Sequence, residues 1–213
     1  MSLEEIGYYD NPRVDAVARL PRPIGTVLDV GCGAGGVGAT LRAAGATRIV
    51  GIEPHAPSAE RARDVLDEVH EGTVEDVLAG GAVAGPFDTI VAYDVLEHVV
   101  DPAPVVSGLL PLAAPGGRLH VSVPNARHFS LLVDLVVRGT FGYTEWGHRD
   151  RTHLRWFTRR DLEALVRAGG WTPVRTDANV LGRNQLVDRV TFGRLREFLA
   201  LQYQVLAVAG RQS

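Results

Sequence analysis

Four glycines, at positions 31, 33, 35 and 36, follow directly on the apolar run VLDV and precede a stretch with helical spacing. Glycine tolerates positive φ and close approach to its backbone, so such a loop can turn tightly between a buried strand and a helix. Glu53 ends the next apolar run, where a carboxylate can accept two hydrogen bonds from a ribose diol. Loop and acid together predict a nucleotide-type ligand, and Gly31-x-Gly33-x-x-Gly36 fits either NAD or S-adenosylmethionine. The alternatives are that the glycines form only an ordinary tight turn and that Glu53 is only a solvated residue at the end of a strand.

Short β-branched apolar runs alternate with amphipathic stretches along the chain, which is typical of βα units around a parallel sheet. The sequence therefore predicts a doubly wound α/β fold in a single domain covering residues 1–213. The predicted strands are 25–30, 47–52, a weaker one near 69–74, 87–92, 117–123, 171–177 and 201–209. The predicted helices are 11–20, 36–44, 56–67, 102–113, 158–168 and 185–199.

The alternation stops after Val123. Residues 129–138 have helical spacing, but residues 139–157 are rich in aromatic residues, Arg and His and have no clean period. A long aperiodic segment after the carboxyl end of a strand is typical of a lid or substrate loop. We therefore predict that residues 125–157 form a lid or substrate-binding insertion. Thr158, with Asp161 three residues on, is expected to cap the next helix.

The composition excludes some classes of partner. The net charge is −3 and the pI is near 6.2, so the whole molecule has no basic field to hold a nucleic acid. The chain is 46% hydrophobic, but no apolar run approaches the ~18 residues that would span a bilayer. Cys32 is the single cysteine and no signal-peptide pattern is found, so we expect a cytoplasmic protein without nucleic-acid or membrane partners.

Four motifs occur in the order and spacing of the class I S-adenosylmethionine-dependent methyltransferases, which this chain resembles: LDVGCGAGG, GIEP, FDTIVAYDVLEH and LAAPGGRLHVSVPN. The segment YTEWGHRDRTHLRWFTRRDLEALVRAGGW is similar to one bacterial subgroup, the small-molecule and glycan-associated methyltransferases of ubiquinone-biosynthesis type. The similarity covers about residues 8–177. It implies a Rossmann-like sheet of seven strands, mostly parallel with an antiparallel last strand. It also implies S-adenosyl-L-methionine as cofactor and a small-molecule or sugar acceptor.

The resemblance further implies which residues bind the cofactor. Asp29 and the glycine loop would face its methionyl part, and Glu53 would take the ribose hydroxyls. Thr73 stands where many relatives have an Asp for the adenine, so Glu75 and Asp76 are candidate substitutes. The full set expected at the cofactor is Tyr9, Asp29, Gly31, Cys32, Gly33, Gly35, Glu53, Pro54, Thr73, Val74, Glu75, Tyr93, Asp94 and His98.

Methyl transfer from a sulfonium is an in-line displacement, so the protein must align the reacting atoms and exclude water. A hydroxyl acceptor also loses a proton, and imidazole, with a pKa of roughly 6.5, suits that step. His153 belongs to the segment that resembles the subgroup and is our candidate proton acceptor, with fixing of the lid as the alternative role. His148 departs from the aliphatic residue expected there and is our candidate acceptor contact. These two and Asp150 show no recognised metal-ligand spacing, so no metal site is predicted.

The expected function is transfer of a methyl group from S-adenosylmethionine to an oxygen, or as second choice a nitrogen, of a small molecule or sugar. An NAD-dependent oxidoreductase or epimerase is one alternative, but its commonest catalytic pattern, Tyr-x-x-x-Lys, requires a lysine and this sequence has none. A non-catalytic cofactor-binding protein is the other. A nucleic-acid methyltransferase would favour an Asn-Pro-Pro-Tyr-like pocket where this chain has YDVLEH. The sequence does not indicate an oligomeric state.

Overall fold

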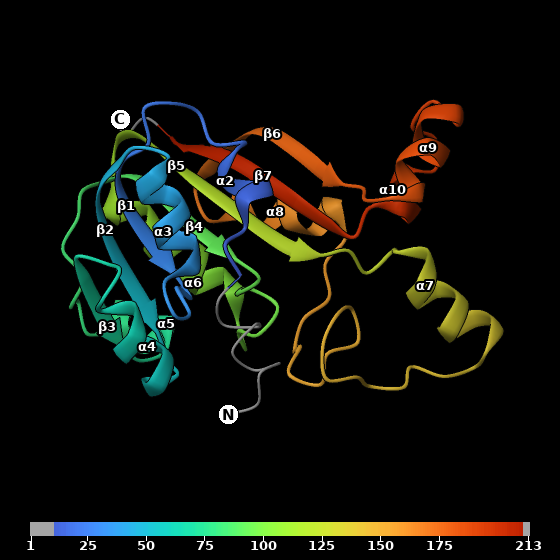
Figure 1. The fold of residues 1–213 in the computed structure, drawn as a ribbon, viewed down its shortest axis with the longest axis horizontal. Helices are drawn as coiled ribbons and strands as arrows, with labels where there is room; N and C mark the ends of the chain where they lie inside the picture. The colour runs from blue at the N-terminus through green and yellow to red at the C-terminus, as the bar shows by residue number, and fades with distance from the viewer. Residues whose placement is uncertain (1–10, 211–213) are drawn as a thin grey trace.

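The computed structural model describes residues 11–210 and contains a seven-stranded sheet with helices on both faces (Figure 1). The strand order is β3-β2-β1-β4-β5-β7-β6. The neighbours among β1 to β5 pair in parallel, and β7 runs antiparallel to both β5 and β6. The predicted fold, with its antiparallel last strand, is therefore confirmed. The strands are β1 (Gly25–Val30), β2 (Ala46–Glu53), β3 (Glu68–Glu71), β4 (Phe87–Tyr93), β5 (Ala113–Pro124), β6 (Trp171–Asn179) and β7 (Gln202–Ala209).

Two hydrophobic clusters place the helices on the two faces of the sheet. Ala16 of α2 and Leu41 of α3 belong to one cluster, and Val106 of α6 and Leu162 of α8 belong to the other. Burial of these side chains fixes the helices to the sheet, because apolar surface removed from water stabilises the fold. The helices are α2 (Val14–Val17), α3 (Gly36–Ala43), α4 (Ala56–Ala62), α5 (Val74–Ala79), α6 (Pro102–Leu109), α7 (Phe129–Leu132), α8 (Arg159–Ala168), α9 (Arg183–Val190) and α10 (Arg196–Leu199).

The carboxyl ends of the central strands meet at one edge of the sheet. In the register, Asp29 of β1 lies beside Gly51 of β2 and Val91 of β4. The loops that follow these three strands are therefore neighbours, although they are far apart in the sequence. In open α/β sheets this edge is where ligands bind.

The structure corrects the prediction around the third strand. The strand expected near 69–74 ends at Glu71, and Val74 already begins α5, a helix that the sequence analysis did not predict. Thr73 explains the early start, because its hydroxyl accepts a hydrogen bond from the backbone N–H of Asp76 and so caps the helix. The preceding helix is also shorter than the predicted 56–67 and ends at Ala62.

Three other predicted helices are shorter or interrupted. The helix expected over 185–199 is two helices, α9 and α10, because Phe192 and Gly193 both have positive φ, at 52° and 75°. The helix expected over 11–20 is the single turn α2. The segment 129–138 begins as α7 and continues as a π-helical turn over Val133–Val137. The amphipathic spacing thus predicts that these segments contain helix, but it does not locate the points where the helices end or break.

The insertion 125–157 is closed at its base. Asn125 and Phe157 form an isolated parallel bridge, and the N–H of Ala126 donates to the carbonyl of Phe157 at 2.9 Å. α8 then starts with the predicted cap: Thr158 and Asp161 form a complete capping box. The insertion therefore leaves and rejoins the core at adjacent points.

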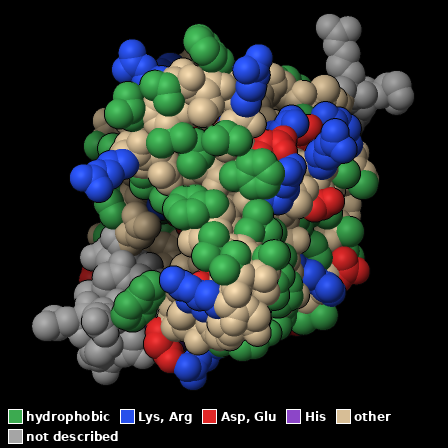
Figure 2. Space-filling view, turned by 90° about the vertical axis from the view of Figure 1, so that its right-hand side faces the viewer, with side chains coloured by type: hydrophobic (Ala, Val, Ile, Leu, Met, Phe, Trp, Pro, Cys, Tyr) green, Lys and Arg blue, Asp and Glu red, His purple; other side chains and the backbone are tan. Residues whose placement is uncertain are grey.

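The end of the molecule that carries α7, α9 and α10 is rich in exposed apolar side chains. Figure 2 shows this end, where hydrophobic side chains gather with Arg side chains among them. No helix in residues 11–210 has the length and apolar character that crossing a membrane would require. The large apolar side chains exposed on these helices and on the residues that directly follow α7 and α9 include Val136, Val137, Leu186, Val190 and Phe192.

Candidate functional site

The glycine loop after β1 is folded against the end of β2. The N–H groups of Gly31 and Cys32 both donate to the carbonyl of Ile52, at 2.8 and 3.0 Å. Gly31 has a φ of 71°, and a Cβ there would lie 2.5 Å from the Val95 side chain. Only glycine fits this position, since it combines positive φ with close contact to a neighbour.

Glu53 fastens the same loop from the end of β2. Its Oε2 accepts from the N–H of Gly33 and its Oε1 from the N–H of His55, both at 2.9 Å. Burial raises the pKa of Glu53, while these two backbone hydrogen bonds oppose the rise. Each carboxylate oxygen has two lone pairs, so both can still accept a further hydrogen bond from a diol. These hydrogen bonds therefore fix the orientation of the Glu53 carboxylate beside the glycine loop.

Asp29 is the second buried carboxyl group at this edge. It is 1% exposed, and its Oδ2 has no hydrogen-bond partner among the described residues. Burial raises the pKa of Asp29 to about 8, and the nearby Glu53 adds to the rise. An unpartnered buried acceptor is costly, so the geometry favours a ligand that brings a hydrogen-bond donor or positive charge to Asp29.

The other residues expected at the cofactor differ in whether their side chains are buried, hydrogen-bonded or exposed. Cys32 is buried and burial raises the pKa of its thiol, which suits a packed loop residue and not a nucleophile. The Thr73 hydroxyl is occupied, since it also donates to Asp76 Oδ2 at 2.8 Å. Glu75 and Pro54 are exposed, whereas Val74 is buried in the core. Tyr9 lies outside the described residues.

Tyr93 is the last residue of β4 and Asp94 follows it, and the two differ in what their polar atoms contact. The Tyr93 hydroxyl lies 2.8 Å from Nδ1 of His120, and burial lowers the pKa of that imidazole to about 3. The Tyr93 hydroxyl is therefore occupied inside the core and is not available to a ligand. Asp94 has a φ of 57° and receives hydrogen bonds from Arg13 and, at 2.8 Å, from Gln202 Nε2.

Arg13 is a polar residue that the sequence analysis missed. It is 6% exposed and pairs with Asp94, and it also donates to Ser122 Oγ and Gln202 Oε1, both at 3.0 Å. Its guanidinium lies 5.3 Å from the ring centroid of Tyr93. No local motif marks Arg13, since it reaches partners on β5 and β7 that are over a hundred residues away.

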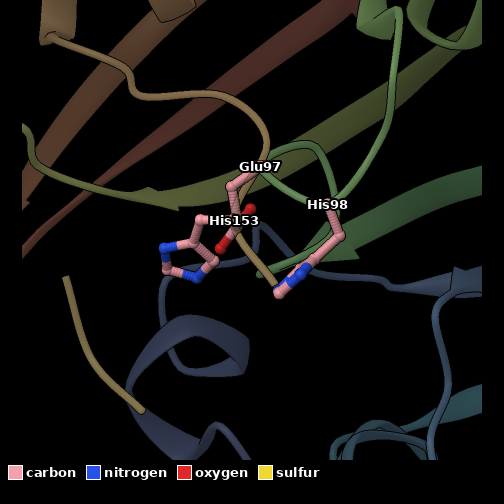
Figure 3. Close-up of side chains that lie close together, drawn as sticks. All are labelled: Glu97, His98 and His153. Carbon is pink, nitrogen blue, oxygen red and sulfur yellow. The ribbon is translucent and has the colours of Figure 1, made fainter. Parts of the chain in front are cut away.

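Glu97, His98 and His153 form a compact cluster after β4 (Figure 3). Their potential ligand atoms all lie within 4.8 Å of one another, and the rings of His98 and His153 are 4.8 Å apart between centroids. Burial and the charge of Asp94 raise the pKa of Glu97 well above its usual range. Burial lowers the pKa of His153, and the charge of His98 lowers it further. Sequence analysis predicted His98 and His153 as site residues but not Glu97.

The end of the insertion is hydrogen-bonded to the loop that carries Glu97. The N–H groups of Leu154 and Arg155 both donate to the Glu97 carbonyl, at 2.8 and 3.0 Å. This pairing of distant segments places the His153 side chain over the Glu97 carboxyl group. The residues of the loop YDVLEH and of the insertion thus form one site.

His148 lies elsewhere in the insertion. Its ring stacks on that of His128 at 4.7 Å and 9°, and its Nε2 lies 2.9 Å from the Leu201 carbonyl. Burial lowers the pKa of His148. The residue also lines a hollow of about 480 Å³ built entirely from residues of the insertion: Ser130, Leu131, Asp134, Thr144, Glu145, Trp146, His148 and Arg149.

A family comparison agrees with this arrangement. The sequence profile described as "Methyltransferase domain" matches residues 7–176. The chain belongs to this methyltransferase domain family. The family resemblance predicted from the sequence is therefore confirmed, and the glycine loop, Glu53, and the cluster of Glu97, His98 and His153 all lie within the matched range.

Individual relatives differ in how much of the chain they cover. A ubiquinone biosynthesis O-methyltransferase of Xylella fastidiosa is 36% identical over 54% of this chain and 49% of its own length. A ubiquinone biosynthesis O-methyltransferase of Aromatoleum aromaticum is 34% identical over 56% of this chain and 56% of its own length. The chain thus spans about half the length of the curated relatives it matches.

Solved structures confirm the methyltransferase fold over nearly the whole chain. A methyltransferase of Thermotoga maritima, described as a possible histamine N-methyltransferase, has a TM-score of 0.65 at 19% identity and covers 98% of this chain and 92% of its own. Magnesium protoporphyrin IX methyltransferase of Synechocystis, solved with bound SAH, has a TM-score of 0.66 at 19% identity and covers 99% of this chain and 89% of its own. These similarities support the fold of the C-terminal strands as well as that of the matched domain.

Proposed function

We propose that this chain is an S-adenosyl-L-methionine-dependent methyltransferase that methylates an oxygen atom of a small molecule. The observation that carries the proposal is the glycine loop held by Glu53, with the buried and unpartnered carboxyl group of Asp29 beside it. The names of the curated relatives support oxygen as the acceptor atom.

The residues present fit the cofactor. The Asp29 carboxyl group provides an acceptor and, when ionised, a negative charge for an amino-acid ammonium group. Glu53 can accept hydrogen bonds from the ribose hydroxyls while keeping those from Gly33 and His55. When bound, the cofactor supplies a methyl group on a positively charged sulfur. NAD would also use Glu53, but a buried Asp29 that needs a donor favours the zwitterionic tail of S-adenosylmethionine.

The acceptor would lie between the end of β4 and the insertion 125–157, which we propose as lid and substrate-binding segment. The hollow of about 480 Å³ in the insertion is within the size range of small-molecule sites, which is roughly 300–1,000 Å³. His148 lines it and is the proposed acceptor contact. His153, at the neighbouring cluster, is the proposed catalytic residue for an acceptor hydroxyl. A sugar acceptor and a cytoplasmic location stay predictions from the sequence.

Calorimetry with S-adenosylhomocysteine and with NAD tests the cofactor. We expect micromolar-range binding of S-adenosylhomocysteine, and Glu53→Ala should weaken it by roughly 1 to 3 kcal/mol through loss of charge-assisted hydrogen bonds. Glu60→Ala is the matched control, because Glu60 is a 78%-exposed side chain on α4. Tight binding of NAD with none of S-adenosylhomocysteine would contradict the proposal.

Turnover of labelled cofactor with a panel of hydroxylated acceptors tests His153. We expect His153→Asn to lower turnover by ~10²-fold, the usual contribution of a positioned proton-transfer group, with cofactor affinity kept. His70→Asn on β3 is the control, since this histidine lies outside the cluster. Joint loss of thermal stability and cofactor binding would instead make His153 a residue that fixes the insertion.

A further inference from the structure

Most of the residues around the hollow of the insertion are polar. Of the eight residues that line it, only Leu131 and Trp146 have apolar side chains, and the other six are polar or charged. Sites for apolar ligands are instead lined predominantly by hydrophobic and aromatic side chains. The hollow therefore suits a ligand that offers hydrogen-bonding groups over most of its surface.

Trp146 gives the hollow an exposed aromatic surface, because it is 61% exposed. The other two tryptophans have structural partners: Trp171 is buried and donates to the Val106 carbonyl at 2.9 Å, and Trp156 packs edge-on against another aromatic ring. The backbone of Trp146 is held in place, since its carbonyl accepts from the Thr144 hydroxyl at 2.8 Å. The indole ring is therefore available for stacking by a ligand.

The charged groups of the hollow are paired with one another. The buried Asp134 carboxylate contacts Arg138 at 2.5 Å and Arg149 at 3.2 Å. The more exposed Glu145 pairs with Arg151. The two carboxylates are thus not free to attract a cation, and Arg149 is not free to attract an anion. Their remaining lone pairs and N–H groups can still bind neutral hydroxyl groups.

His148 adds a hydrogen-bond acceptor to the lining and joins the hollow to the proposed catalytic residue. Burial lowers the pKa of His148 and keeps its ring neutral. Its Nε2 lies 2.9 Å from the Leu201 carbonyl, so the ring proton is on Nε2 and Nδ1 keeps a lone pair. The His153 ring is hydrogen-bonded to the His148 backbone. The hollow therefore adjoins the cluster that contains His153.

We propose that the hollow binds a neutral pyranose ring, so that the methyl acceptor is a hydroxyl group of a sugar or glycoside. A pyranose has a face of C–H groups that can pack on the Trp146 ring, and hydroxyls that both donate and accept hydrogen bonds. Glu145, Arg149 and His148 would bind these hydroxyls. A phenol or catechol could also stack on the indole, but its one or two hydroxyls would leave most of the polar lining unpaired.

The role of the sugar as acceptor rests on the proposed function, whereas its binding in the hollow does not. In the reaction, the sugar oxygen forms a C–O bond to the methyl carbon as the C–S bond of the sulfonium breaks, and the electrons of that bond stay on sulfur. The hydroxyl proton passes to His153. The products are a sugar methyl ether and S-adenosylhomocysteine.

Saturation-transfer NMR with the full chain tests the binding directly. The probes are the methyl glycosides of glucose, galactose, mannose, rhamnose and fucose, with catechol and glucuronic acid for comparison. We expect saturable binding of at least one glycoside and weaker binding of both comparison compounds. Trp146→Ala should weaken glycoside binding at least about tenfold, and Trp146→Phe should keep most of it because an aromatic face remains. Trp156→Phe is the control, since Trp156 is exposed but does not line the hollow.

Transfer of labelled methyl groups to the glycoside that binds tests the acceptor role. We expect Trp146→Ala to raise KM at least about tenfold and to keep kcat, because the ring binds the acceptor and takes no part in the chemistry. Circular dichroism checks that the variants fold, which the exposure of Trp146 favours.

Four outcomes would overturn the inference: no glycoside of the panel binds, only catechol or glucuronic acid binds, Trp146→Ala binds the glycoside as tightly as the wild type, or no bound glycoside is methylated by a chain that binds the cofactor. Calorimetry with S-adenosylhomocysteine separates the two proposals. If a glycoside binds through Trp146 and S-adenosylhomocysteine does not bind, the sugar site stands and the methyltransferase proposal fails. If S-adenosylhomocysteine binds and no glycoside does, only the sugar site is refuted.

Discussion

The two halves of the candidate site are held together in different ways. At the cofactor side, the glycine loop is fixed by its immediate neighbours in the sheet, through the Ile52 carbonyl and the Glu53 carboxylate. At the insertion, which is the proposed acceptor side, the contacts join segments that are distant in sequence, such as Asn125 with Ala200 and His148 with Leu201. The acceptor side also carries strongly exposed apolar residues, among them Val136 at 77%.

This difference predicts different responses to ligands. A loop fixed by neighbouring strands is pre-formed, so binding there costs little reorganisation. An insertion that rests on a few long-range hydrogen bonds can open locally at a lower free energy than the core. We therefore expect changes on the cofactor side to act on affinity and electrostatics, and changes on the acceptor side to act on the order of the insertion and on turnover.

The largest effect is expected from Asp29→Asn, measured as the free energy of unfolding against pH. The folded pKa is about 8 and the ordinary value is 3.8, so between these pH values the folded state holds a proton that the unfolded state has lost. The stability contributed by the protonated carboxyl is thus fully present below pH 3.8 and is lost as the pH rises to about 8. Asn cannot titrate, so at pH 8 the variant should be more stable than the wild type, on the order of several kcal/mol.

Asp88→Asn is the matched control, at the opposite end of the same strands. Hydrogen bonds from the backbone and hydroxyl of Thr26 lower the pKa of Asp88, so its stabilising effect is present above the ordinary pKa and is lost as the pH falls. Asp88→Asn should therefore lower stability at neutral pH. If Asp29→Asn also lowered the free energy of unfolding at neutral pH, the ionised carboxyl group of Asp29 would not destabilise the folded protein, and the prediction would be wrong.

The second effect is expected from Asn125→Ala at the base of the insertion. The buried Nδ2 donates to the Glu197 and Ala200 carbonyls, both at 2.8 Å, and Oδ1 accepts from the Arg127 N–H. Losing these bonds and leaving buried partners unpaired should cost about 2 to 4 kcal/mol in urea-induced unfolding. Turnover should fall while S-adenosylhomocysteine affinity stays. The half-buried Asn184 on α9 provides the control, and equal loss of cofactor affinity would contradict the separation of the two halves.

The same contrast explains how much the sequence could predict. The glycine loop, Glu53 and the cap at Thr158 depend on residues a few positions apart or on consecutive strands, and spacing predicted their structure. Arg13 and Glu97 were not predicted as site residues, because their partners are distant in sequence and come close only in the folded chain. The π-turn after α7 and the break at Phe192 were also missed, since apolar spacing does not report a local change of backbone.

The smallest effect is expected from Thr158→Ala, which lies where the insertion rejoins the core. Thr158 accepts from the Asp161 N–H, and Asp161 Oδ2 accepts from the Thr158 N–H at 3.1 Å. Loss of such a cap costs about 1 kcal/mol, and Thr158→Ser should recover most of it because serine caps equally well. Thermal unfolding measures the loss. Because the cap is local to α8, we expect turnover and cofactor affinity to be unchanged in Thr158→Ala. If turnover falls and Thr158→Ser restores it, the start of α8 instead positions His153, which lies five residues before Thr158.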